Sequence, residues 1–144
     1  PTAGVDAKAR REFWDLIGDL ASEGMTVLVS THYMDEAERC QRVVYLSGGR
    51  LIVQGTAEDV VRDAQLVVFE TAGGGLDALT RRLRRAPGVE NAAIFGHALR
   101  VVGLDRAALQ AAVTSVAPDR EWAMVPARLD DVFIHLLNAQ ESGE

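Results

Sequence analysis

The sequence has little of what marks several common classes of protein. One cysteine, Cys40, among 144 residues excludes an internal disulfide framework and a multi-cysteine zinc site. No apolar run approaches the roughly 18 residues that would predict a membrane span, and the polar first residues do not resemble a signal peptide. Lys and Arg total 15 against 21 Asp and Glu, a net charge of -6. This balance argues against a nucleic-acid-binding protein, which usually carries a basic excess.

Enough apolar residues are present to form a core. Hydrophobic residues make up 48% of the sequence and charged residues 25%, which excludes a wholly disordered chain. The length allows one ordinary domain or two small ones. Because the chain begins at Pro1, in the middle of a motif rather than at a methionine, we expect it to be a piece of a longer protein.

The pattern of residues 1–63 predicts an α/β fold. An apolar stripe at helical spacing predicts a helix over residues 8–22, with Asp6 as its N-cap and Gly24 just past its end. A continuous β-branched run over residues 26–30 predicts a strand that is buried on both faces, as in parallel sheets. The remaining elements expected in this part are a helix over 35–41, a hairpin of strands 43–46 and 50–53 around a glycine turn, and a short helix that Thr56 caps.

Residues 64–144 begin a new alternation of strands and helices. The expected order is βαββαβ, which is the ferredoxin-like split βαβ unit, followed by an amphipathic C-terminal helix. The expected strands cover residues 66–70, 92–95, 99–102 and 122–125. The expected helices have inward faces made of Leu76, Leu79 and Leu83, of Leu109, Ala112, Val113 and Val116, and of Leu129, Val132, Phe133, Leu136 and Leu137.

His32 is the residue whose position most suggests chemistry. It lies two residues past the predicted strand 26–30 and before a predicted helix. In open α/β sheets, ligands bind outside the carboxyl ends of the strands, and an imidazole there can hydrogen-bond a phosphate oxygen or position a water molecule. The alternative is a loop histidine that caps backbone groups.

Two blocks of sequence carry a family resemblance. Pro1-Thr2-Ala3-Gly4-Val5-Asp6, followed by a helix and then by Val27-Leu28-Val29-Ser30-Thr31-His32-Tyr33-Met34-Asp35-Glu36-Ala37-Glu38, resembles the end of the ATP-binding subunit of an ABC transporter, specifically of the ABC-2 type or multidrug exporter branch. The hairpin over 42–55 and the later segment 129–133 are also similar to that family. The resemblance implies that residues 1–63 are the C-terminal slice of a P-loop NTPase sheet, and that residues 64–144 are an accessory or regulatory α+β domain.

The resemblance also implies roles for particular residues. Ala3, Gly4, Val5 and Asp6 match the D-loop, which in the family lines the dimer interface and contacts the nucleotide site of the opposite subunit. His32 matches the switch histidine, which contacts the γ-phosphate and helps orient the attacking water. The implied partners are a membrane-spanning ABC-2 type permease and a second copy of the subunit, with no nucleic acid. The implied location is the cytoplasmic face of the cell membrane.

Other motifs of the family are not in this sequence. It contains no G-x-x-x-x-G-K-[ST] segment to cradle phosphates, no signature motif, and no Walker B Asp and Glu. We therefore expect ATP and Mg²⁺ to bind, and ATP to be hydrolysed, only in the full-length subunit and not by this chain alone. The alternative is a regulatory or interaction module with no enzymatic role.

Several other clusters suggest chemistry, but each has a simpler structural explanation. Residues 73–75 are a glycine turn rather than an anion site, since no lysine accompanies them. The arginines of residues 81–85 could touch anionic lipid, but the solvated face of an amphipathic helix is the favoured interpretation. Acids near a helix N-terminus are expected from the helix dipole, so no metal site is inferred. We take the remaining candidates to be structural: Asp35, Glu36, Glu38, Cys40, His97, His135, Trp14 and Trp122.

The predicted strand 26–30 has a physical consequence for the chain on its own. A strand without its neighbours presents unpaired backbone groups that invite association. We therefore expect the isolated chain to dimerise or to pair in an unusual way.

Overall fold

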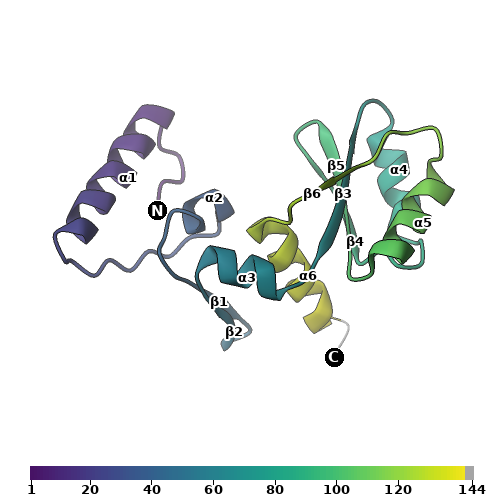
Figure 1. The fold of residues 1–144 in the computed structure, drawn as a ribbon. Helices are drawn as coiled ribbons and strands as arrows, with labels where there is room; N and C mark the ends of the chain where they lie inside the picture. Colours follow the sequence, from purple (N-terminus) through teal and green to yellow (C-terminus); the bar gives the residue numbers. More distant parts are fainter. Residues whose placement is uncertain (142–144) are drawn as a thin grey trace. The chain divides into compact units, whose positions relative to one another are not determined.

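The computed structural model describes residues 1–141 and has a mixed α/β fold. The described residues contain six helices and two antiparallel sheets (Figure 1). The chain divides into two compact units, Pro1–Ala37 and Glu38–Glu144, and each unit is described by itself below.

The first unit is built around helix α1, Ala7–Ser22. The Asp6 carboxylate accepts hydrogen bonds from the backbone N–H groups of Lys8 and Ala9 at 3.0 and 3.1 Å, which confirms Asp6 as the N-cap. Helix α2, Met34–Ala37, is shorter than the predicted helix over 35–41.

The predicted strand over residues 26–30 is wrong. These residues form neither helix nor strand, and the Leu28 side chain is 97% exposed. A β-strand needs a neighbouring strand to satisfy its N–H and C=O groups, and no strand in the described part of the chain pairs with this segment. The apolar run therefore stays without regular structure, with Leu28 exposed and Val27 and Val29 half-buried.

The second unit begins with a hairpin of β1, Val43–Ser47, and β2, Arg50–Gly55. The turn between them, Gly48-Gly49, has φ values of 55° and 73°, the left-handed conformation that a two-residue hairpin turn requires. Helix α3, Ala57–Asp63, follows. The Thr56 hydroxyl accepts a hydrogen bond from the Asp59 N–H at 3.0 Å, which confirms the predicted cap.

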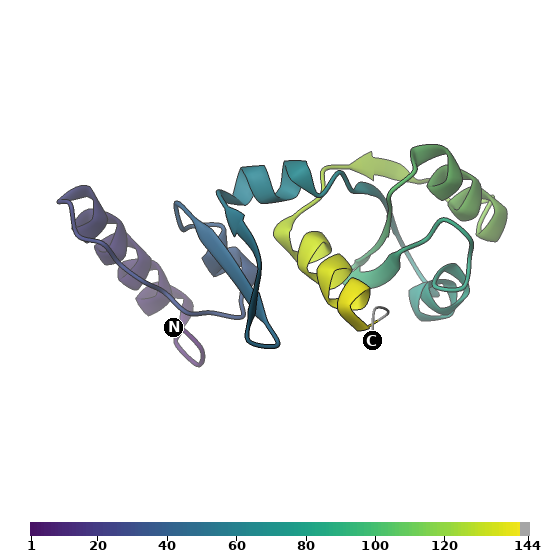
Figure 2. The ribbon, with the colours of Figure 1, turned by 90° about the horizontal axis from the view of Figure 1, so that it is seen from below.

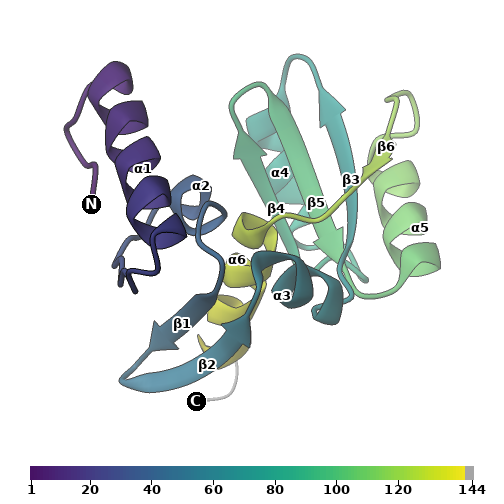
Figure 3. The same cartoon turned by 60° about the vertical axis from the view of Figure 1, so that its left-hand side comes forward.

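The larger sheet has four strands in the order β4-β5-β3-β6, and every neighbouring pair is antiparallel (Figure 3). Helices α4 and α5 lie on one side of this sheet and helix α6 lies on the other (Figures 1 and 2). The strands are β3 Val67–Ala72, β4 Asn91–Phe95, β5 Ala98–Gly103 and β6 Ala123–Val125, and the helices are α4 Leu76–Leu83, α5 Arg106–Val116 and α6 Leu129–Glu141. The predicted sequence of elements is therefore present from β3 to α6.

The core of the second unit lies between this sheet and helices α4 and α5. Alternate residues of the strands, such as Phe69 on β3 and Val101 on β5, point to this side. The core cluster consists of Phe69, Leu76, Leu79, Leu83, Ala92, Leu99, Val101, Leu109 and Val113. It contains most of the inward positions predicted for the two helices.

The opposite side of the sheet binds helix α6 through charged residues. Arg100 on β5 is only 2% exposed, and Asp131 on α6 only 1%. Their side chains form a bidentate pair, with Nη2 to Oδ2 at 2.7 Å and Nε to Oδ1 at 3.2 Å. The Arg100 Nη1 also donates to Glu70 Oε2 at 2.8 Å. Helix α6 is thereby tied to the middle of the sheet.

The hairpin and α3 belong to the same compact unit as the larger sheet. The Tyr45 ring on β1 stacks on the Phe133 ring of α6, with centroids 4.5 Å apart, and α3 also contacts α6. The boundary between the two compact units follows Ala37. The β1–β2 hairpin and one face of α6 cover each other's apolar surface, which neither element could bury alone.

Candidate functional site

The D-loop candidates form a tight turn in the first unit. The Val5 N–H donates to the Thr2 carbonyl at 3.2 Å, which closes a turn with Ala3 and Gly4 at its centre. Gly4 has a φ of 74°, a conformation that strongly favours glycine at this turn position. Ala3, Gly4, Val5 and Asp6 are all exposed, so the turn presents its surface to solvent.

His32 lies in the loop between the extended segment and α2. Its side chain is exposed, and its ring lies 4.2 Å from the ring of Tyr33, centroid to centroid. Among the described residues no hydrogen bond or ion pair engages the imidazole. Both ring nitrogens are therefore available to a ligand, whereas a histidine that caps backbone groups would have one of them engaged.

The two candidate segments are connected through a buried carboxylate, Glu36. The Thr2 N–H donates to Glu36 Oε1 at 3.3 Å, and the Thr2 hydroxyl donates to the same oxygen. The Thr31 hydroxyl donates to Oε2 at 2.5 Å. Thr2 directly precedes the turn of residues 3–6, and Thr31 directly precedes His32. The Glu36 side chain thus connects the residue that precedes the turn of residues 3–6 with the residue that precedes His32.

The surroundings of Glu36 favour its ionised form. The side chain is only 1% exposed, and this burial raises the pKa, but hydrogen bonds from Thr2 and Thr31 outweigh the effect and lower the pKa of Glu36 to about 2. The carboxylate is therefore charged and fully hydrogen-bonded at neutral pH.

The loop before α2 is also held against α1. The Arg10 guanidinium lies over the Tyr33 ring, 5.5 Å from its centroid, and Arg10 Nη1 lies 3.5 Å from Asp35 Oδ2. The Tyr33 N–H donates to the Thr31 hydroxyl at 3.0 Å. The neighbours on both sides of His32 are therefore held by hydrogen bonds and ring contacts, while the His32 ring itself lies against Tyr33.

Sequence reasoning missed Glu36. The sequence places it with Asp35 and Glu38 among acids that the helix dipole explains, and does not distinguish it from these two neighbours, which are exposed. The one available signal was that a threonine adjoins each of the two candidate segments, since buried carboxylates need hydroxyl or amide donors. Nothing in the spacing indicates which of the three acids the threonines would meet.

The described residues provide no cluster that resembles a metal centre and no helix suited to crossing a bilayer. Between residues 1 and 141, no group of three or more His, Cys, Asp or Glu side chains is placed to hold a metal ion. No helix in that range combines the necessary length and apolar character for a membrane span.

Comparison with known proteins identifies relatives along almost the whole chain, although no family model matches it. Nod factor export ATP-binding protein I of Neorhizobium galegae is 35% identical over 138 residues, which are 94% of this chain and 39% of that protein. The protein of the same name from Cupriavidus pinatubonensis is 36% identical over 139 residues, covering 94% of this chain and 42% of its own length. The probable multidrug ABC transporter ATP-binding protein YbhF of Escherichia coli is 50% identical over 60 residues, which are 42% of this chain and 10% of YbhF.

These relatives are ATP-binding proteins of export and multidrug systems by name. The chain is homologous to ABC transporter ATP-binding proteins and corresponds to the C-terminal part of such a subunit. It spans about two fifths of the length of the Nod factor export relatives that it matches.

Proposed function

We propose that this chain is the C-terminal part of the ATP-hydrolysing subunit of an ABC-2 type exporter. The subunit would energise transport of a drug-like or other small substrate across the membrane. The observation that carries this proposal is the similarity to a Nod factor export ATP-binding protein along 94% of the chain, together with the similarity to a multidrug ABC transporter ATP-binding protein over 42% of it. The two sequence blocks around Asp6 and His32, in the order found in that family, support it.

In this proposal His32 acts on the nucleotide. Its exposed imidazole, with both nitrogens unengaged within the described residues, would donate a hydrogen bond to a γ-phosphate oxygen and help orient the attacking water. Phosphoryl transfer is catalysed mainly by such positioning and charge stabilisation. The turn of Ala3, Gly4, Val5 and Asp6 would line the interface with a second copy of the subunit and contact the nucleotide site of that copy.

ATP and Mg²⁺ would be held largely by other residues of the full-length subunit. The described residues fit one part of that site, because the exposed His32 imidazole can donate a hydrogen bond toward a terminal phosphate. No segment of this sequence has the pattern of a phosphate-binding loop. We therefore expect this chain alone neither to bind ATP tightly nor to hydrolyse it, and a micromolar, Mg²⁺-dependent signal in a fluorescent-nucleotide titration would contradict this.

The fold supports different roles for the two parts of the chain. Residues 1–63 would complete the P-loop NTPase sheet, in which the segment 26–30 would become a strand between neighbours supplied by the rest of the subunit. Residues 64–144 would form a ferredoxin-like accessory or regulatory domain, which the antiparallel order β4-β5-β3-β6 and the helices α4 and α5 on one side of that sheet support. The subunit would work at the cytoplasmic face of the membrane with an ABC-2 type permease.

The test uses the full-length subunit, assembled with its permease, carrying His32→Ala. We expect ATP turnover to fall by about 100-fold or more, the usual cost of removing one transition-state donor, while nucleotide affinity changes little. The matched control is His97→Ala, which removes an exposed histidine in a hairpin turn. Undiminished hydrolysis by the His32 variant would overturn the assignment.

A further inference from the structure

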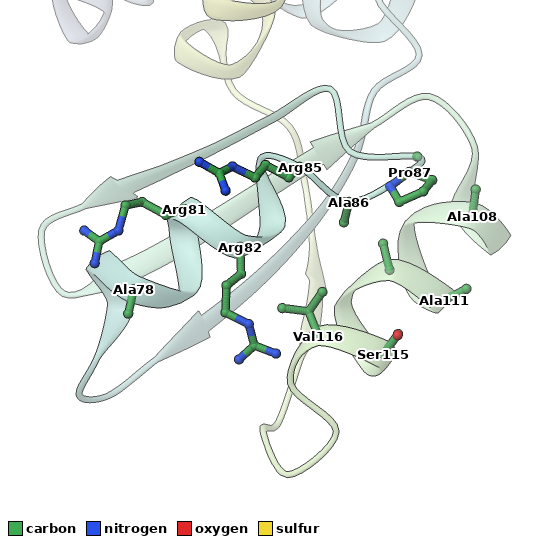
Figure 4. A pocket seen from close by; sticks show the side chains of 12 residues that line it. Ala78, Arg81, Arg82, Arg85, Ala86, Pro87, Ala108, Ala111, Ser115 and Val116 are labelled. Carbon is green, nitrogen blue, oxygen red and sulfur yellow. The ribbon is translucent and has the colours of Figure 1, made fainter.

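A groove runs between helices α4 and α5 on the surface of the second unit (Figure 4). Its volume is about 980 Å³, close to the upper end of the range of small-molecule sites. The floor is made of small or apolar side chains, among them Ala86, Pro87, Ala111 and Val116. Such a surface offers an organic molecule apolar contact, and its concave form gives room for a body larger than an inorganic ion.

The charge of this groove is of one sign. Three arginines of α4 and the segment after it line the groove, Arg81, Arg82 and Arg85, and none of its lining residues is acidic. Within the described residues these three guanidinium groups have no hydrogen-bond or ion-pair partner, whereas the neighbouring Arg84 donates to the Ala92 carbonyl at 2.8 Å. A concentration of unpaired positive charge on a chain of net charge -6 favours an anion.

The arginines are not equivalent. Figure 4 shows the Arg82 side chain extending from α4 toward Val116 of α5, across the groove, while the side chains of Arg81 and of Arg85, which follows α4, point in other directions. Arg82 also lines a smaller hollow beside the groove, together with Ala78 and Val116. Arg82 is therefore the cation nearest to the apolar floor, and Arg81 and Arg85 add to the positive potential around it.

We propose that this groove binds a soluble organic anion with an apolar body. Its carboxylate, phosphate or sulfonate group accepts hydrogen bonds from the Arg82 guanidinium, which is suited to bidentate recognition of planar or tetrahedral anions. Its body lies against Ala86, Pro87, Ala111 and Val116. A flat bilayer surface would meet the rim of the groove and leave the concavity to water, so the shape favours a free molecule over a lipid headgroup.

The proposal goes beyond the proposed transport function, which does not require this groove. It is tested on the 144-residue chain with an aromatic sulfonate, 8-anilinonaphthalene-1-sulfonate, as the probe and with N-phenyl-1-naphthylamine as its uncharged analogue. We expect saturable one-to-one binding of the sulfonate and much weaker binding of the analogue. Arg82→Gln is expected to weaken sulfonate binding about tenfold or more, as loss of a charge-assisted hydrogen bond predicts. Ala111→Trp, which fills the groove from an exposed position, is expected to abolish it.

The matched control is Arg106→Gln, because Arg106 is an exposed arginine on α5 that does not line the groove. It should bind the sulfonate as the parent chain does, and circular dichroism should show that all three variants keep the fold. Sulfonate binding that is indifferent to both Arg82→Gln and Ala111→Trp would overturn the proposal. Arg82-dependent binding to phosphatidylglycerol vesicles without any binding of the free sulfonate would also overturn it, since the arginines would then bind a membrane surface and not a free molecule.

Discussion

Arg100 and Asp131 form a buried bidentate ion pair across 31 positions of sequence, with the closest nitrogen and oxygen 2.7 Å apart. The pair is extended by Glu70 on β3 and by the Pro126 carbonyl, each of which accepts a hydrogen bond from Arg100 at 2.8 Å. Asp131 Oδ2 also accepts from the Arg128 N–H at 2.8 Å, at the start of α6. One carboxylate thus caps the last helix and fixes it to the sheet. Burial lowers the pKa of Arg100, but Asp131 and Glu70 outweigh this effect and raise it above its usual value.

We predict that Asp131→Asn destabilises the chain by about 2 kcal/mol or more, because it weakens the charge-assisted bidentate hydrogen bonds of the buried Arg100 and leaves Glu70 as its one carboxylate partner among the described residues. The measurement is urea unfolding followed by far-ultraviolet circular dichroism. Asp119→Asn, at an exposed carboxylate, is the control and should change stability little. Equal stability of the two variants would show that the pair does not hold α6.

The ionisation of Glu36 gives a pH dependence with a definite sign. Its pKa is lowered in the folded chain from 4.5 to about 2, so the unfolded chain takes up this proton first as the pH falls. The stabilisation from Glu36 is complete above about pH 4.5 and is lost progressively toward pH 2.

This loss is measured with Trp14 as the reporter, since it is buried in the first unit. Trp122 lies in the second unit and is replaced by Phe in all samples. Glu36→Gln should flatten the acid dependence of Trp14 fluorescence between pH 4.5 and 2, whereas Glu38→Gln, at an exposed neighbour, should retain it. An unchanged acid profile in the Glu36 variant would contradict the assigned role.

The open segment 26–30 predicts association of the isolated chain. Leu28 is 97% exposed and Met25 is 55% exposed, and the backbone around them has no strand partner in the described residues. We expect the chain to dimerise in a concentration-dependent way in light scattering, and Leu28→Asp to reduce this association. Leu104→Asp, at another exposed leucine, should not. A strictly monomeric parent chain over a wide range of concentration would refute the prediction.

Close packing at Gly103 predicts a large cost for a single methyl group. A Cβ at this position would lie 2.6 Å from the Gly88 carbonyl oxygen and 3.2 Å from Leu109 Cδ1. We expect Gly103→Ala to destabilise the second unit by about 2 kcal/mol through overpacking, measured by thermal unfolding. Gly74→Ala, where a Cβ meets nothing within 4 Å, is the control, and it should unfold near the parent temperature.

Elements whose signals are local were predicted correctly from the sequence. Asp6 and Thr56 cap their helices, and the glycine pair at 48–49 makes the hairpin turn. The order of strands and helices from residue 66 onward also follows from hydrophobic periodicity alone. These features depend on residues within a few positions of one another.

Features that depend on distant partners were missed or were wrong. Residues 26–30 have the composition of a buried strand, but a strand exists only where a neighbour pairs with it. Arg100 and Glu36 are buried because their partners lie 31 and 34 positions away, and no local pattern distinguishes them from exposed charged residues. The roles of Ala3, Gly4, Val5, Asp6 and His32 in nucleotide chemistry stay predictions.

The stacking of Tyr45 on Phe133 has a consequence for exchanging this part of the subunit between relatives. Because the β1–β2 hairpin shares its apolar face with the last helix, a chimera joined at residue 63 would pair a hairpin from one parent with a helix from another. The hairpin and α6 should therefore come from the same parent, and a junction after Ala37 takes both from one parent. Swapped subunits should therefore tolerate the earlier junction and misfold at the later one.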